Sequence, residues 1–146
     1  MMKLMIELIP RSAWFNNLRN ALPASGWDRL RRKTYADYNH RCGVCGGGGR
    51  LNCHERWEFD DVRHVLTLKG FIALCDLCHH VKHIGYAEVL AEQGRLDFST
   101  VVRHFMRVNN CDRYTFQRCR DEAMELWYNR SCSQWTVDMS MAGATA

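Results

Sequence analysis

The chain has 146 residues, of which 47% are hydrophobic and 25% are charged, the ordinary composition of one globular domain. Its first residues lack the long apolar stretch of a signal peptide or a membrane helix, so we expect a cytoplasmic protein with no membrane role. The formal net charge is +4, and residues 1–50 hold nine Lys and Arg against three Asp and Glu. This asymmetry suggests an anionic partner such as DNA, although a solvated helix face gives the same pattern.

Residues 1–41 are expected to form a short strand and a basic helix. The strand covers residues 4–9 and ends at Pro10. From Trp27 to Tyr38 the aromatic and apolar residues follow helical spacing with basic residues between them. Ser25 is the candidate N-cap of this helix.

Residues 42–85 are expected to form the core of the domain. Two Cys-x-x-Cys pairs, Cys42 with Cys45 and Cys75 with Cys78, flank two predicted strands at 51–54 and 65–68. Residues 55–64 connect these strands. A helix should follow from about residue 76 to residue 84, with Gly85 as its C-cap.

Residues 86–140 are expected to form a helical extension that ends in a strand. Helices are predicted over 86–93, 98–108 and 114–128, and Asp97 and Asp112 are the expected N-caps of the last two. Alternation over residues 135–139 predicts a final strand, which we expect to pair with the strand at 4–9. The tail over 141–146 is expected to be disordered, and the whole chain to be one domain.

The paired cysteines favour a zinc site over disulfides. Thiolates are preferred zinc ligands, and four of them close a tetrahedron with no open position, so this site should be structural. The other four cysteines have no such spacing and are expected to be small packing residues. They are Cys53, Cys111, Cys119 and Cys132.

A second metal site is predicted at three histidines. His79 and His83 are four residues apart and therefore share one face of the expected helix, and His54 lies on the first core strand. Three imidazoles leave a position open for water or a phosphate oxygen, as in catalytic sites. The other histidines are expected to be exposed or internally satisfied. They are His40, His64, His80 and His104.

The stretch from Cys42 to His83 resembles the HNH endonuclease family. Zinc-stapled members of that family carry Cys-x-x-Cys, a strand-end His pair, a central Asn, and a Cys-x-x-Cys-His-x-x-x-His run, which residues 75–83 match without a gap. The resemblance implies an α+β fold with a ββα-metal core and two zinc knuckles. It also implies that His54, His79 and His83 bind the catalytic ion, and that this ion contacts the phosphate and stabilises the leaving 3′-oxygen.

Two positions depart from the family pattern. The residue after the first histidine deprotonates the attacking water in the family, and here it is Glu55 rather than His. A carboxylate is a weaker base than an imidazole by roughly two pKa units. Gly70 stands in place of the central Asn, and Asn52 should point away from that position.

The leading hypothesis is a metal-dependent HNH-type endonuclease that hydrolyses DNA phosphodiester bonds. The cofactors would be zinc at the cysteines and a second divalent ion, zinc, magnesium, manganese or nickel, at the histidines. Candidate phosphate contacts are Arg29, Arg32, Lys33 and Lys82.

Two alternatives stay open. The first is a catalytically silent HNH-like zinc-binding module that binds nucleic acid or a protein partner, such as a phage or plasmid factor that inhibits a host nuclease. In the second, both metal sites are structural. The sequence leaves the oligomeric state undetermined.

Overall fold

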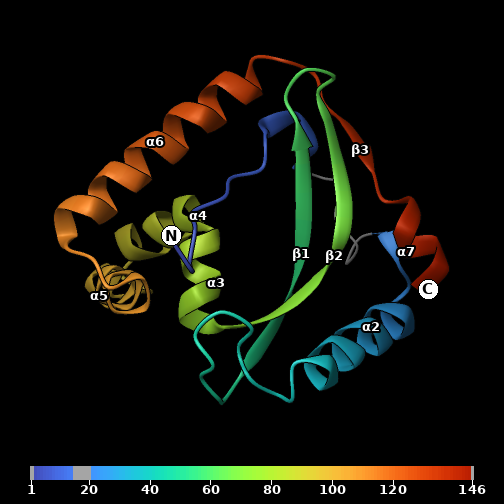
Figure 1. The fold of residues 1–146 in the computed structure, drawn as a ribbon, viewed down its shortest axis with the longest axis horizontal. Helices are drawn as coiled ribbons and strands as arrows, with labels where there is room; N and C mark the ends of the chain where they lie inside the picture. The colour runs from blue at the N-terminus through green and yellow to red at the C-terminus, as the bar shows by residue number, and fades with distance from the viewer. Residues whose placement is uncertain (1, 15–20, 146) are drawn as a thin grey trace.

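The computed structural model describes residues 2–14 and 21–145. The chain has an α+β fold in which a long β-hairpin stands between two groups of helices (Figure 1). The elements are η1 (Arg11–Ala13), α2 (Ala24–Asp37), β1 (Leu51–Asp60), β2 (Val65–Cys75), α3 (Asp76–Lys82), α4 (Ile84–Glu92), α5 (Phe98–Asn109), α6 (Arg113–Ser131), β3 (Thr136–Asp138) and α7 (Ser140–Thr145). Among the described residues, no helix has the length and apolar character needed to cross a bilayer.

The hairpin strands are longer than the sequence analysis expected. β1 and β2 pair antiparallel from Leu51 opposite Cys75 to Asp60 opposite Val65, so residues 55–60 are strand and not connection. Trp57 and Phe59 alternate with charged residues, and this pattern is typical of a half-buried strand. The register shifts between Arg56 and Trp57, which marks a β-bulge.

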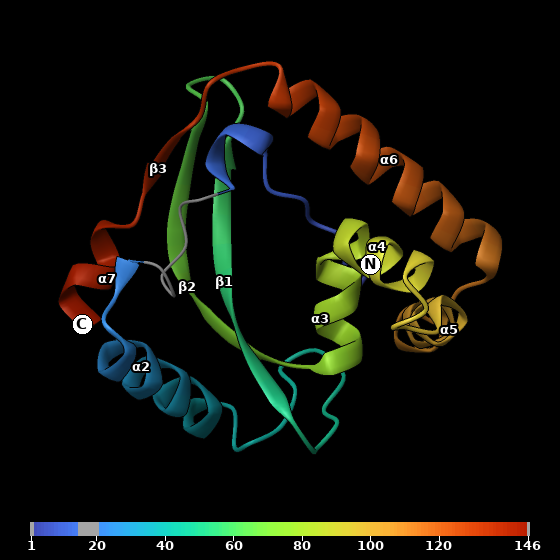
Figure 2. The same ribbon diagram turned by 180° about the vertical axis from the view of Figure 1, so that it is seen from behind.

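The two faces of the hairpin receive different helices. Successive strand residues point to opposite faces. Cys53 donates to Thr34 of α2 on one face, whereas His54 lies against His79 of α3 on the other. The hairpin therefore separates α2 from α3, as Figure 2 also shows from behind.

The N-terminal segment is not a strand, contrary to expectation. Residues 4–9 have no regular secondary structure, and β3 instead pairs in parallel with β2, Thr136 opposite Val65. The side chain of Asn109 accepts from the backbone N–H of Leu4 and donates to its carbonyl, both at 2.9 Å. A side chain of α5 thus satisfies the backbone groups that a neighbouring strand would otherwise have bonded.

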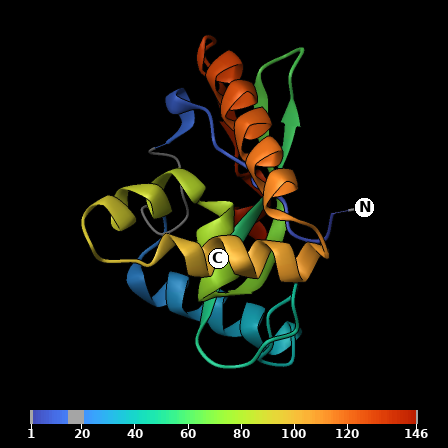
Figure 3. The same ribbon diagram turned by 90° about the vertical axis from the view of Figure 1, so that its left-hand side faces the viewer.

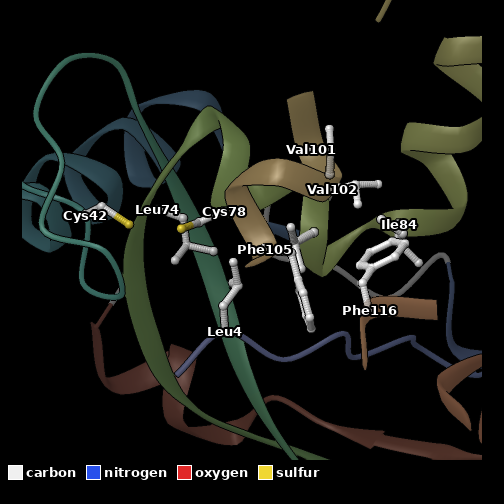
Figure 4. Packing of buried hydrophobic residues seen from close by; sticks show 10 residues of the cluster. Leu4, Cys42, Leu74, Cys78, Ile84, Val101, Val102, Phe105 and Phe116 are labelled. Atoms are coloured by element: carbon white, nitrogen blue, oxygen red, sulfur yellow. The ribbon is translucent and has the colours of Figure 1, made fainter. Parts of the chain in front are cut away.

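The main core lies between the hairpin and helices α3 to α6. α5 lies across α3 (Figure 3), and the apolar side chains between them are almost fully buried (Figure 4). The buried members are Leu4, Cys42, Leu74, Cys78, Val81, Ile84, Val101, Val102, Phe105 and Phe116. Two of these are cysteines of the predicted zinc site, so that site is continuous with the core.

Several predicted helix ends are corrected by the structure. α3 ends at Lys82, and Gly85 lies inside α4 rather than capping α3. α2 begins after Pro23, with Ser25 within its first turn.

Other predicted ends agree with the structure or extend it. Asp97 and Asp112 are confirmed as N-caps, because their carboxylates accept from the backbone N–H groups of Ser99 and Thr115. The tail from residue 141 was expected to be disordered, but Ser140–Thr145 forms helix α7.

Candidate metal centres

Four cysteines meet where the hairpin joins α3. Cys42 and Cys45 lie in the turn before β1, Cys75 ends β2, and Cys78 lies in the first turn of α3. In each pair a backbone N–H donates to a sulfur at 3.4 Å, from Gly47 to Cys45 and from Cys78 to Cys75. The backbone of each turn thus helps to fix the position of one sulfur.

The spacing of the four sulfurs fits a tetrahedral ion. The Sγ atoms of Cys45 and Cys75 are 3.7 Å apart, and all four sulfurs lie within 4.8 Å of one another. Metal–sulfur bonds of about 2.3 Å in a tetrahedron require sulfur–sulfur separations of about 3.8 Å. The group could hold a metal ion.

The four sulfurs influence one another's protonation. A hydrogen bond from Cys78 lowers the pKa of Cys42 to about 4, and burial raises the pKa of Cys75 to about 11. The pKa of Cys78 is raised, chiefly because its thiol donates to Cys42. Figure 4 shows the sulfurs of Cys42 and Cys78 directed toward each other. Four thiolates this close repel one another, so ionising all of them requires a cation between them.

A buried histidine on α5 contacts this centre. His104 is only 3% exposed, and its Nε2 lies 3.1 Å from the Cys78 sulfur. Arg107 donates to Nδ1 of His104 at 2.9 Å. Because a guanidinium can only donate, Nδ1 is the acceptor and Nε2 carries the hydrogen that points at Cys78. His104 is thus internally satisfied, as expected, but its contact with Cys78 also makes it part of the four-cysteine site, which was not predicted.

The three predicted histidines converge between β1 and α3. His54 comes from the middle of β1, His79 from α3, and His83 from the junction of α3 and α4. Their coordinating nitrogens lie within 4.8 Å of one another, and the ring centroids are 4.7–5.6 Å apart. The rings meet edge to face, so their nitrogens can point at one position.

The protein holds the imidazoles of His54 and His83 in the neutral form that binds metals. Burial, followed by the charges of His83 and His79, lowers the pKa of His54 to about 2. Burial also lowers the pKa of His83. Nδ1 of His54 is the one buried side-chain nitrogen or oxygen in the described part of the chain that has no hydrogen-bond partner. A metal ion would satisfy that nitrogen.

A cavity of about 600 Å³ opens beside the histidines. His54 and His83 form part of its wall, so an ion held there would be accessible from one side. The rest of the wall is mainly apolar and comes from the N-terminal segment, β1, α4 and α6. It consists of Glu7, Leu8, Ile9, Ala13, Trp14, Glu55, Trp57, Gly85, Tyr86, Val89, Met124 and Trp127.

Glu55, the predicted general base, is less favourably placed than the ligands. It contributes to the cavity wall, but strand alternation directs its side chain to the face of Cys53, opposite His54. The charge of Glu55 indeed helps to raise the pKa of Cys53, after the larger effect of burial. The other carboxylate on the described cavity wall belongs to Glu7.

Neither Gly70 nor Asn52 takes the role of the central Asn in the HNH pattern that the sequence resembles. Gly70 is buried beneath the side chain of Arg56, whose Nη2 lies 2.5 Å from the position of an added Cβ. Asn52 donates to the Asp76 carboxylate at 2.8 Å and to the Leu74 carbonyl at 3.2 Å. Asn52 therefore ties β1 to the start of α3 and does not orient a base.

The candidate phosphate contacts divide between the two faces of the hairpin. Lys82 lies close to the histidines, since its charge helps to lower the pKa of both His54 and His83. Arg29, Arg32 and Lys33 are exposed on α2, the helix on the opposite face. Only Lys82 therefore adjoins the histidine group.

The remaining cysteines and histidines stay outside both groups. Cys111 and Cys119 pack at the edge of the main core, and Cys132 is exposed. His40 is exposed, and the ring of His64 lies 5.4 Å from that of Trp135.

Comparisons of this chain with models of protein families, with curated proteins and with solved structures find no match. The function proposed for this chain is therefore based on the geometry of its two candidate metal sites.

Proposed function

We propose that this chain is a metal-dependent endonuclease of the HNH type, which hydrolyses phosphodiester bonds in DNA. The observation that carries the proposal is the convergence of His54, His79 and His83 beside an open cavity. Strand β1 supplies the first of these ligands, and α3 with the residue that follows it supplies the other two, in the order that the family resemblance implies. The four cysteines would hold a structural zinc ion at the base of the same hairpin.

The residues divide the chemistry between them. A divalent ion held by the three imidazoles would supply Lewis-acid stabilisation of charge on the phosphate and the leaving 3′-oxygen. Lys82 adds positive charge beside the histidines, which favours an anionic substrate. The lowered pKa values of His54 and His83 keep both imidazoles neutral at neutral pH, and neutral imidazole is the form that binds a metal.

The general base is assigned by a pair of matched variants. Glu55 occupies the family position, and Glu7 lines the same cavity from the N-terminal segment. If Glu55 accepts the proton of the attacking water, Glu55→Gln should reduce turnover by about 100-fold or more without loss of metal, and Glu7→Gln should not. The reverse pattern would transfer the role to Glu7.

The proposal is tested by incubating purified protein with supercoiled plasmid and with single-stranded DNA, each with added magnesium, manganese, nickel or zinc. Metal-dependent nicking is expected in the wild type and in His80→Ala, which changes a neighbouring histidine outside the group. Nicking should vanish in His83→Ala. Nicking that survives in His83→Ala would overturn the proposal.

A catalytically silent binding module is the second candidate. The observation in its favour is Gly70, where the family carries an Asn and this chain has only the overlying Arg56. This candidate predicts zinc at the cysteines and no cleavage with any metal.

A third candidate, in which the histidine ion is purely structural, requires a fourth protein ligand. Within the described residues, the histidine group has three members and borders the cavity. The fourth protein ligand that this candidate requires is therefore not among the members of that group.

A further inference from the structure

We propose that the cavity beside the histidine group receives an unstacked nucleobase, so that the substrate is single-stranded or unpaired nucleic acid. This inference rests on the proposed function, because it places the phosphate next to that base at the histidines. It adds the class of nucleic acid, which the metal ligands alone do not define.

The cavity wall contains a rigid aromatic platform. The rings of Trp14 and Trp127 are stacked, with centroids 6.0 Å apart and planes inclined by 14°. Both indole nitrogens donate to the carbonyl of Ile9, at 2.8 Å from Trp14 and 3.0 Å from Trp127. One carbonyl thus anchors two rings, and the platform is preorganised for a flat ligand.

The rim of the cavity exposes aromatic and apolar side chains. Trp14 is 50% exposed, Tyr86 is 60% exposed and Val89 is 45% exposed, and all three line the cavity. Such gathered exposure marks a binding surface. Aromatic side chains beside a backbone-binding site are the usual means of holding bases of single strands.

The polar groups at the cavity suit a nucleotide better than a purely apolar ligand. His54 and His83 lie on its wall, where an ion would meet a phosphate. The guanidinium of Arg11 lies 5.1 Å from the centre of the Trp127 ring, so positive charge adjoins the platform. The carboxylate of Glu7 on the cavity wall offers an acceptor for an N–H group of a base.

A base within a duplex must leave its stack to enter this cavity. Its faces are covered by neighbouring base pairs, and entry would require unstacking at a cost of a few kcal/mol. A single strand already has accessible bases. The volume of about 600 Å³ and the enclosing side chains therefore favour unpaired over paired substrate.

The test measures binding separately from cleavage. Protein that holds one zinc ion per chain, as expected for the cysteine centre, is titrated without other added metal into fluorescein-labelled oligothymidylate, an abasic strand of equal length, and the oligothymidylate paired with its complement. Anisotropy is recorded. Single-stranded RNA forms a further arm, because the base chemistry is shared. The inference predicts that the strands with bases bind tighter than the abasic strand and the duplex.

Two exposed tyrosines supply a matched pair of variants. Tyr86→Ala removes an aromatic ring at the cavity, whereas Tyr114→Ala removes one that is 79% exposed on α6 and does not line it. Tyr86→Ala should weaken binding to the strand with bases by about 5- to 150-fold, the loss expected for one base–aromatic stack. Tyr114→Ala should leave binding unchanged, and neither variant should lose zinc.

The outcomes separate this inference from the proposed function. Equal binding of oligothymidylate and the abasic strand, or equal effects of the two tyrosine variants, would overturn the inference even if plasmid is nicked. Base-dependent binding without cleavage by any metal would support the inference and overturn the hydrolytic activity. Absence of nucleic-acid binding would overturn both.

Discussion

His104 is predicted to stabilise the metal at the four-cysteine centre without being a ligand. Its Nε2–H points at the Cys78 sulfur from 3.1 Å, and Arg107 holds the ring in the tautomer required for this contact. A hydrogen bond to a coordinating thiolate disperses its charge. Loss of such an outer contact typically costs about 10- to 100-fold in metal affinity.

Two leucine substitutions at adjacent positions isolate this effect. His104→Leu keeps bulk at a residue that is 3% exposed but removes the N–H donor. Phe105→Leu introduces leucine at the next residue, which is 1% exposed and belongs to the main core, and it should destabilise the fold through the cavity that it leaves. His104→Gln retains an N–H donor.

Zinc affinity is measured by competition with a chromophoric chelator at neutral pH, beside the free energy of unfolding by urea. His104→Leu should lower zinc affinity by about 10- to 100-fold, with partial recovery in His104→Gln. Phe105→Leu should change it by less than His104→Leu does. Equal zinc affinity in wild type and His104→Leu would refute the role assigned to His104.

Three further changes test the framework around the site. Cys75→Ala should release zinc and unfold the middle of the chain, seen as lost near-UV circular dichroism; a native signal without zinc would contradict this. Asn109→Ala removes three hydrogen bonds to the backbone of Lys3 and Leu4, so thermal unfolding should show a loss of about 1–3 kcal/mol. A hydrogen bond from Arg130 lowers the pKa of Asp61, so this pair stabilises the fold above the ordinary carboxyl pKa and is lost as pH falls through the lowered value. Asp61→Asn should therefore cost less than about 1 kcal/mol at pH 7, because Asp61 is 54% exposed, and should flatten stability below pH 4; an unchanged acid profile would count against the pairing.

The sequence predicted the elements of the site whose signals are short in range. Two residues between cysteines define a metal-binding turn, and the four-residue interval from His79 to His83 places both on one side of α3. Asp97 and Asp112 were recognised as caps for the same reason, since a cap bonds within its own helix. Features that depend on residues a few positions apart can therefore be predicted from one sequence.

The contacts that were missed are tertiary. Residues 4–9 alternate like a strand. The backbone of Leu4 is nevertheless hydrogen-bonded to a side chain of α5, and no local sequence pattern predicts that contact. His104 shares the buried face of α5 with Val101 and Phe105, and that was a usable signal. A polar residue on an apolar helix face needs a buried partner, yet the sequence could not identify that partner as Cys78.

The length of the hairpin was underestimated for a different reason. Glu55, Arg56 and Glu58 resemble a polar connection. The structure instead continues β1 through them, because Trp57 and Phe59 are partly buried against a small hydrophobic cluster. This extension also directs Glu55 away from His54. The geometry of the presumed base therefore depended on a strand boundary, the least certain part of a prediction from sequence.

The central claim, that the three histidines hold an ion used for cleavage, is tested most directly by measuring plasmid nicking and metal content in the same samples. The account predicts that the nicking rate rises with a second ion per chain and that His83→Ala keeps the first ion, remains folded and does not nick. Nicking at full rate with only the cysteine-bound ion present, or nicking by His83→Ala, would contradict the account.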